Sequence, residues 1–291
     1  MLRRTVSYAL WIGVTSLVFA YPLFDVARFG LSNDDASHIF IVPLLSAATL
    51  WLDRKALFQS LTHDYIFGAL FALAGVTTFT LTYLSKGSLH DSDRSAGYML
   101  AVVLIWISGF FVTFGRRAAR AAKFSLLLLL LAIPFPTAIL HEIVYLLQMG
   151  SAQIVSIIFN ILGVSYLREG FVFDVGSISI AVAEECSGIR SSMAVLILAL
   201  LAAHIYLRRF WSQALFVAAS IVIMIVKNGI RIATLTLLSI HVDPGFLSGR
   251  LHHQGGFVFF FLGLALLGPV LWFLTERETV KPQRSLSTNP S

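Results

Sequence analysis

Residues 95–115 read SAGYMLAVVLIWISGFFVTFG, an uncharged run that decides the fold class. About 20 consecutive apolar residues suffice for an α-helix to cross the hydrocarbon core of a bilayer. Other uncharged or nearly uncharged runs cover residues 6–24, 39–52, 65–84, 124–140, 143–167, 191–207, 210–226 and 255–275. The runs are continuous, whereas the strands of a membrane barrel alternate apolar and polar residues. The sequence therefore predicts an all-α polytopic membrane protein.

The composition supports this class. The chain is 57% hydrophobic and 12% charged, and its mean hydropathy is +0.84. The net charge of +6 comes from short basic clusters between the apolar runs, so we expect contact with membrane lipid and no nucleic-acid partner. A single cysteine excludes an internal disulfide and a multi-cysteine metal site. No metal and no cofactor are expected.

The basic clusters predict the topology. They are Arg3 and Arg4; Arg54 and Lys55; Arg116, Arg117, Arg120 and Lys123; Arg208 and Arg209; and Arg277, Lys281 and Arg284. Such clusters mark cytoplasmic loops. They share one side only if 143–167 makes no net crossing and is re-entrant, interfacial or a helix that enters and returns. We therefore expect about eight transmembrane helices in the cell (inner) membrane and both termini in the cytoplasm. The alternative topology leaves Arg208 and Arg209 outside.

The expected organisation has three parts. N-terminal transmembrane helices occupy 1–123, a transmembrane core with the candidate catalytic residues occupies 124–275, and a disordered cytoplasmic tail occupies 276–291. Within the core, residues 171–175 and 177–181 alternate around Val175-Gly176-Ser177, which predicts a short extracytoplasmic β-hairpin. The 143–167 run is the most polar, and Gln153, Ser156 and Asn160 share one helical face.

The only cysteine, Cys186, lies in the stretch VAEECSGIRS, residues 182–191, where a polar loop meets an apolar helix. Ser187 can cap that helix, and the helix N-terminus and Arg190 favour the reactive thiolate. The negative charges of Glu184 and Glu185 disfavour the thiolate unless other cations pair with them. The alternative is a structural cysteine at a helix start.

A second candidate, Arg231, follows a long uncharged run, which places its guanidinium at or near membrane depth. Charges there are costly and are usually functional or paired. The alternatives are a snorkelling arginine or a structural partner for Glu184 or Glu185. Lys227 is expected at the membrane interface, and Asn228 is expected to form hydrogen bonds between helices.

A third candidate is the pair His252-His253, just before the last apolar run. Adjacent histidines point in different directions, so only one is expected to join a given site. Interfacial polar residues are the alternative, and the spacing lacks a partner set for metal. The predicted topology places Cys186, Arg231 and His252 on the outer side. His38, at an expected helix start, is assigned to an outer cavity.

Three motifs appear in order along the chain. They are Glu185-Cys186-Ser187-Gly188-Ile189-Arg190, Asn228-Gly229-Ile230-Arg231-Ile232, and His252 followed by Gly256-Phe257-Val258-Phe259. Their order and spacing resemble the exosortase/archaeosortase family of membrane cysteine transpeptidases. The likeness is best over residues 125–260, includes Pro134-Phe135-Pro136, and extends weakly to Ser37-His38 with Pro43. Phe257 departs from the tryptophan that often follows the glycine in this family.

The resemblance implies Cys186 as nucleophile, Arg231 as stabiliser of the transition state and His252 as acid/base, with no cofactor. Supporting candidates are Arg190, Asn228, His253, Glu185, Ser187 and His38. The implied activity is that of a cysteine protease and transpeptidase acting at the outer face of the membrane. Its implied partners are exported proteins with a C-terminal sorting signal, which consists of a short motif, a transmembrane helix and a basic end. The cleaved protein would pass to an acceptor.

Other function classes explain part of the sequence. A non-catalytic membrane scaffold of an exopolysaccharide or envelope assembly system fits the helices but leaves the three candidate residues unexplained. A transporter could use Arg231 and the outer carboxylates, yet few polar residues occupy the inner half. Common intramembrane proteases need paired intramembrane aspartates, a Gly-x-Ser-x-Gly/His pair or His-Glu-x-x-His, and the sequence lacks these.

Overall fold

The computed structural model describes residues 2–33, 36–176, 178–182, 189–247 and 256–279. The chain forms two compact units, Met1–Leu140 and His141–Ser291, which we describe separately. Within the described residues the structure is mainly helical, with one small sheet.

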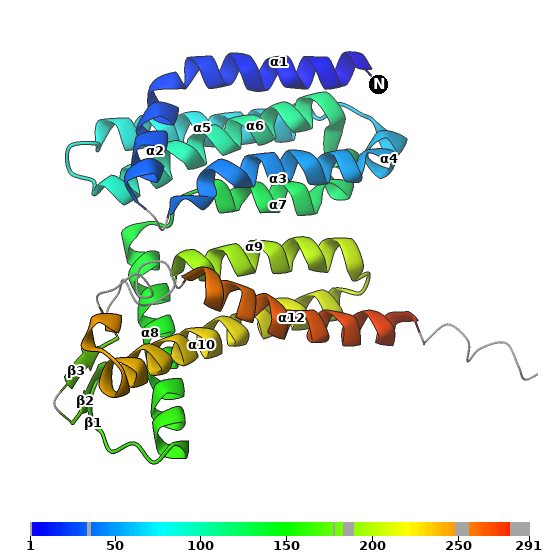
Figure 1. The fold of residues 1–291 in the computed structure, drawn as a ribbon. Helices are drawn as coiled ribbons and strands as arrows, with labels where there is room; N and C mark the ends of the chain where they lie inside the picture. Colours follow the sequence, from blue (N-terminus) through cyan, green and yellow to red (C-terminus); the bar gives the residue numbers. More distant parts are fainter. Residues whose placement is uncertain (1, 34–35, 177, 183–188, 248–255, 280–291) are drawn as a thin grey trace, which may run out of the picture. The chain divides into compact units, whose positions relative to one another are not determined.

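The first unit is a bundle of helices built around α6. Its elements are α1 (Leu2–Val18), α2 (Ala20–Ser32), α3 (His38–Leu52), α4 (Arg54–Leu57), α5 (Tyr65–Leu84), α6 (Asp91–Ala121) and α7 (Lys123–Leu129), with short 3-10 turns at Phe58–Ser60 and Leu130–Ala132. Helix α5 packs along α6, and α3 packs along α7 (Figure 1). Helix α7 begins at Lys123, where the sequence analysis placed the end of the N-terminal helices, and it contributes to the core of this unit.

Helix α6 contains the 95–115 run and is the most buried of the long apolar helices. Its partner α5 approaches closely because Gly75 lies against Ile105, and Thr82 lies against Gly97. At Gly115 the backbone leaves the helical region with φ of 81°, a conformation that favours glycine. The preceding carbonyl, of Phe114, accepts from the backbone N–H of Thr62 at 3.1 Å, so the loop before α5 covers the break.

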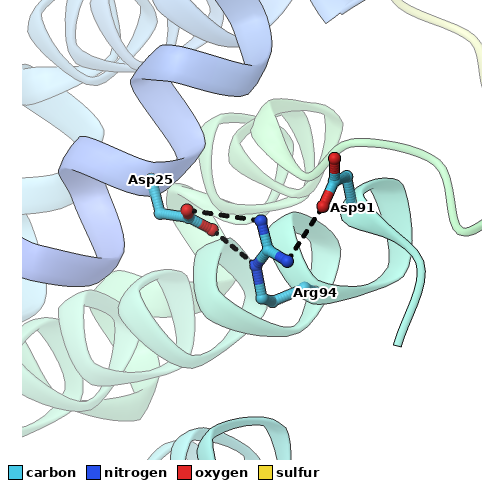
Figure 2. Close-up of polar contacts among 3 residues, drawn as sticks. All are labelled: Asp25, Asp91 and Arg94. Atoms are coloured by element: carbon cyan, nitrogen blue, oxygen red, sulfur yellow. Dashed lines mark hydrogen bonds and ion pairs between the residues drawn. The ribbon is translucent and has the colours of Figure 1, made fainter. Parts of the chain in front are cut away.

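An arginine with two carboxylate partners links α2 to the start of α6 (Figure 2). The Arg94 Nε lies 2.9 Å from Asp25 Oδ2 on α2, and its NH2 lies 3.4 Å from Oδ1. Its NH1 lies 2.9 Å from Asp91 Oδ1, one turn earlier on α6. The Asp25 side chain is 20% exposed and that of Asp91 is 70% exposed. The pair with Asp25 is therefore the better protected of the two.

The second unit contains most of α8 (Thr137–Ile161), the strands β1 (Leu167–Glu169), β2 (Val172–Val175) and β3 (Ile178–Ala181), and then α9 (Ile189–Tyr206), α10 (Phe210–His241), a 3-10 turn (Pro244–Leu247) and α12 (Gly256–Thr279). Helices α9, α10 and α12 each contact the other two, and α8 runs crosswise to them (Figure 1).

The predicted hairpin is confirmed. Strands β2 and β3 are antiparallel, with Val172 opposite Ala181 and Val175 opposite Ile178. The sequence analysis missed β1, which pairs with β2 and makes a three-stranded sheet in the order β1-β2-β3. Gly170, in the connection between β1 and β2, has φ of 62°, which suits a tight turn.

The sheet closes over α8 and α10. Phe159 of α8, Phe173 of β2 and Ile232 of α10 belong to one buried apolar cluster. Arg168 of β1 donates to Ser156 Oγ at 3.0 Å and to Gln153 Oε1 at 3.3 Å. The polar face predicted on 143–167 is thus partly occupied by the sheet.

Five described helices are long and apolar enough to cross a membrane: α5, α6, α8, α10 and α12. A sixth crossing is possible if α1 and α2, which meet at 80°, form one bent span. Three shorter apolar helices, His38–Leu52, Lys123–Ala132 and Ser191–Tyr206, lie where the sequence predicted further spans, but they are shorter than the helices that could cross. The total of eight stays a prediction. Helix α8 is continuous from Thr137 to Ile161, so this segment does not double back as a re-entrant loop.

Helix α12 extends further than the sequence suggested. It includes residues 276–279, which the prediction assigned to a disordered tail, and residues 280–291 lie outside the described part. The physical reason is a tertiary contact: the Glu278 carboxylate accepts from the backbone N–H of Arg208 at 2.8 Å and of Arg209 at 3.1 Å. This contact ties the end of α12 to the connection between α9 and α10.

Helices α8 and α10 meet through reciprocal contacts of glycine with isoleucine. Gly150 of α8 faces Ile225 of α10, and Gly229 of α10 faces Ile154 of α8. A Cβ atom at Gly229 would lie 2.5 Å from two Ile154 carbon atoms, which leaves no room for a larger residue. Small residues of this kind allow helix backbones to approach closely.

Replacing Asp25 by Asn should destabilise the first unit because Arg94 would lose its protected charged partner. We expect the free energy of unfolding to fall by about 1.5–3 kcal/mol, the usual range for a hydrogen bond to a charged group. The matched control is Asp91→Asn, which removes the exposed partner of the same arginine and should cost less than about 1 kcal/mol. Thermal unfolding of the detergent-solubilised variants tests this, and equal losses would contradict the assignment.

Replacing Gly229 by Ala should destabilise the α8–α10 contact because the new methyl group overlaps Ile154. Overpacking of this kind costs about 1–3 kcal/mol. Gly268→Ala is the matched control: a Cβ atom added to this helical glycine would meet no other atom within 4 Å, so the change should be neutral or stabilising by up to about 1 kcal/mol. A melting temperature of Gly229→Ala equal to that of Gly268→Ala would refute the packing argument.

Candidate active site

The structure describes some of the predicted site residues and leaves others outside its described part. Glu184, Glu185, Cys186 and Ser187 fall within 183–188, and His252 and His253 fall within 248–255; both segments lie outside the described residues. Arg190 lies in the first turn of α9. Arg231, Asn228 and His38 are described in full.

The segment that contains Cys186 is anchored at both described ends. Before it, Val182 is 1% exposed, and its backbone N–H donates to the Phe171 carbonyl at 2.9 Å. The Val182 carbonyl accepts from Nε2 of Gln148, on α8, at 2.8 Å. After it, Ile189 begins α9 and is 7% exposed. The six residues 183–188 therefore connect two fixed points within one unit.

The Arg231 motif lies on α10, where its neighbours fix it. The prediction that Asn228 bonds across helices is confirmed, because its Nδ2 donates to Ser151 Oγ of α8 at 2.9 Å. Ile232 and Ala233, on the other side of Arg231, are buried in the cluster beneath the sheet. Arg231 itself is half-buried. Its backbone position is thus held by α8 on one side and the sheet on the other.

Lys227, which the sequence assigned to the membrane interface, is enclosed by the helices of the second unit. Its side chain is 1% exposed, and its Nζ donates to the Ser191 Oγ of α9. Ser191 stands in the first turn of α9, after Arg190. The sequence analysis missed this contact. The i, i+4 spacing shows that Lys227 and Arg231 lie on the same face of α10, but it does not show which other helix packs against that face.

The helix that follows His252 and His253 joins the same group. Helix α12 begins at Gly256, and Phe259 in its first turn is 8% exposed. A Cβ atom at Gly263 would lie 3.5 Å from Lys227 Cδ and 3.7 Å from Val195 Cγ2 of α9. The helix after Cys186, the helix that carries Arg231 and the helix after His252 are therefore mutual neighbours.

His38 belongs to the first unit. It begins α3, is 8% exposed, and its ring lies 6.2 Å from that of Phe135. It lines a small cavity of about 120 Å³ with other residues, among them His90 and Ser92. His90 was not a candidate in the sequence, where it precedes Asp91 as an ordinary loop residue. All the residues that line this cavity belong to the first unit.

The described residues contain no group of three or more histidine, cysteine, aspartate or glutamate side chains arranged to hold a metal ion. What the described elements offer is the start of α9, where Ser191 accepts from Lys227, and a half-buried guanidinium one helical turn after Lys227 on α10. A helix N-terminus and a nearby guanidinium both favour negative charge. Such a setting suits chemistry that develops an anion.

A comparison with models of protein families identifies the family of this chain. The family model described as "Transmembrane exosortase (Exosortase_EpsH)" matches residues 30–268, which include all three motifs and most of both units. Comparisons with curated proteins and with solved structures give no significant match. Because the family match covers most of the chain and the chain has several apolar helices long enough to span a bilayer, this multi-pass membrane protein belongs to the transmembrane exosortase family.

Proposed function

We propose that this protein is a membrane cysteine protease and transpeptidase whose catalytic residues are Cys186, Arg231 and His252. One observation carries the proposal: the helices next to these residues, α9, α10 and α12, pack against each other within one unit. Three residues far apart in sequence can meet only if their supporting elements do. The family match supports the same class of activity.

Each residue has a chemical task in the proposed reaction. The Cys186 thiolate attacks the carbonyl carbon of the scissile peptide bond and forms a C–S bond, while the carbonyl oxygen becomes an oxyanion. The guanidinium of Arg231 donates hydrogen bonds to that oxyanion. When the tetrahedral intermediate collapses, the C–N bond breaks and His252 gives its proton to the leaving amine. The product is a thioester on Cys186.

The thioester is then resolved by a second nucleophile. His252, now neutral, accepts the proton of an acceptor hydroxyl or amine as that group attacks the thioester carbonyl. The C–S bond breaks, the thiolate is restored, and the protein is transferred to the acceptor. Water in the place of the acceptor gives simple cleavage. Transfer and cleavage use the same acyl-enzyme, so the second nucleophile decides whether the reaction is transpeptidation or hydrolysis.

The other candidates have supporting tasks in this proposal. The proposed task of Ser187 is to cap the N-terminus of α9, and that of Arg190, in the first turn of α9, is to add positive charge that favours the thiolate. Glu185 pairs with a cation of the site. Asn228 fixes α10 against α8 through its bond to Ser151.

The proposed substrates are exported proteins that end in a sorting signal: a short motif, a transmembrane helix and a basic end. The basic end stays in the cytoplasm by the same charge rule that orients this chain. The motif then stands at the extracytoplasmic surface, where the predicted topology places Cys186. Arg231 is half-buried and follows Lys227, which bonds to Ser191 at the start of α9, by one helical turn.

Replacing Cys186 by Ala should abolish processing while the protein still inserts and folds, because no other cysteine is present to replace the nucleophile. The measurement is mass spectrometry of the C-termini of exported proteins in cells that carry only the variant. We expect the C-terminal helix and basic end to remain attached. Normal processing in this variant would refute the mechanism. Normal assembly of the cell envelope with Cys186, Arg231 and His252 all replaced would favour a scaffold instead.

Replacing His252 by Ala should slow processing by about 10²–10⁴-fold, the usual contribution of a positioned general acid/base. The matched control is His253→Ala, which should retain most of the activity because adjacent side chains point in different directions. The same measurement of substrate C-termini tests both variants. The reverse order of effects would assign the acid/base role to His253.

A further inference from the structure

Lys227 is buried without an ion pair among the described residues. It is 1% exposed and is among the largest fully buried side chains. Both described salt bridges belong to Arg94, in the other unit. An ammonium group in an apolar helical interior is costly and marks a function more often than a contribution to stability.

The Lys227 side chain touches both helices next to α10. Its Nζ donates to the Ser191 Oγ of α9. Its stem passes Gly263 of α12, where an added Cβ would lie 3.5 Å from the Lys227 Cδ. That Cβ position is also 3.7 Å from Val195 Cγ2 on α9. Lys227 therefore lies where the three helices meet.

These contacts connect the segments of the proposed catalytic residues. Ser191 is in the first turn of α9, five residues after Cys186, and Arg231 follows Lys227 by one helical turn on α10. The bond between Nζ and Oγ thus sets the position of the α9 start relative to the Arg231 turn. We propose that Lys227 is a positioning residue that, through Ser191, aligns the Cys186 segment with Arg231. This inference rests on the proposed function.

The association of the helices does not require this bond. On the other side of α10, Asn228 bonds to Ser151 and Gly229 packs against Ile154. Apolar contacts among α9, α10 and α12 include the buried Val195, Met224 and Leu267. A buried charge can often be replaced by an apolar residue of similar size with no loss of stability or with a gain. A positioning lysine and a structural lysine therefore make opposite predictions for stability.

The test compares Lys227→Met, which keeps the length of the stem, with the wild-type full chain in membranes. Processing of exported proteins should fall by about 10²-fold, the effect of a misplacement of about 1 Å in an active site. The melting temperature should stay the same or rise. Ser191→Ala should give the same defect. The double variant should be no worse than either single variant, because each substitution removes the same bond between Lys227 Nζ and Ser191 Oγ. Lys227→Arg, which keeps a charged donor, should recover part of the activity.

The matched control is Ser220→Ala. Ser220 is a buried hydroxyl on α10 that donates to the Val217 carbonyl of its own helix at 2.7 Å. Its removal should change neither processing nor the position of the Cys186 segment.

A second readout needs no substrate. Cys186 is the only cysteine, so iodoacetamide alkylation of the full chain reports on this thiol alone. The pH profile of the alkylation rate should shift in Lys227→Met and in Ser191→Ala by the same amount, and should not move in Ser220→Ala. A merely structural role would not produce this matched shift.

The outcomes separate the two proposals. If Cys186→Ala abolishes processing and Lys227→Met processes normally with an unchanged alkylation profile, the positioning role is overturned and the proposed function stands. A loss of processing in Lys227→Met together with a lower melting temperature would show an ordinary structural role and would also overturn it. If Cys186→Ala processes normally, the proposed function fails, and the matched shifts in alkylation alone decide whether Lys227 positions this segment.

Discussion

Inside an apolar surrounding, each buried polar group must find its partner within the protein, and the second unit depends on how α10 meets this constraint. Three consecutive residues on one turn of α10 make three different contacts with its neighbours. Lys227 reaches Ser191 of α9, Asn228 reaches Ser151 of α8, and Gly229 gives Ile154 of α8 room to approach. A single turn of helix therefore orients both neighbours, and Arg231 follows it immediately.

The sequence predicted the elements whose signal is local. Long uncharged runs identified α5, α6, α10 and α12, and alternation around Gly176 identified the pairing of β2 with β3. Strand β1 escaped notice because its three residues are too few to show a period, and it exists through its pairing with β2. Local patterns also do not show which distant segments α8 and α12 contact, such as Gln148 with Val182 and Glu278 with Arg208.

For the candidate site, too, local patterns predicted some features and the packing of distant segments determined others. Family motifs pointed to Cys186, Arg231 and His252, and the polar character of Asn228 predicted a bond between helices, which the structure contains. The burial of Lys227 could not be predicted, because a lysine that follows the uncharged run 210–226 suggests the end of a span at the membrane interface, whereas the packing of α9 and α12 encloses it. The role of His90 in the cavity with His38 depends likewise on the fold of the first unit.

The contact of Glu278 with the connection between α9 and α10 has a consequence for how α12 can move. Arg208 and Arg209 stand immediately before α10, and both donate their backbone N–H groups to the Glu278 carboxylate of α12. Further along α12, Gly263 lies against the stem of Lys227. Helix α12 thus contacts the start of α10 near its own C-terminal end and the Lys227 side chain nearer its own start. A sliding motion of α12 along its axis would break both contacts, so together they oppose a change in the axial position of Gly256, where α12 begins.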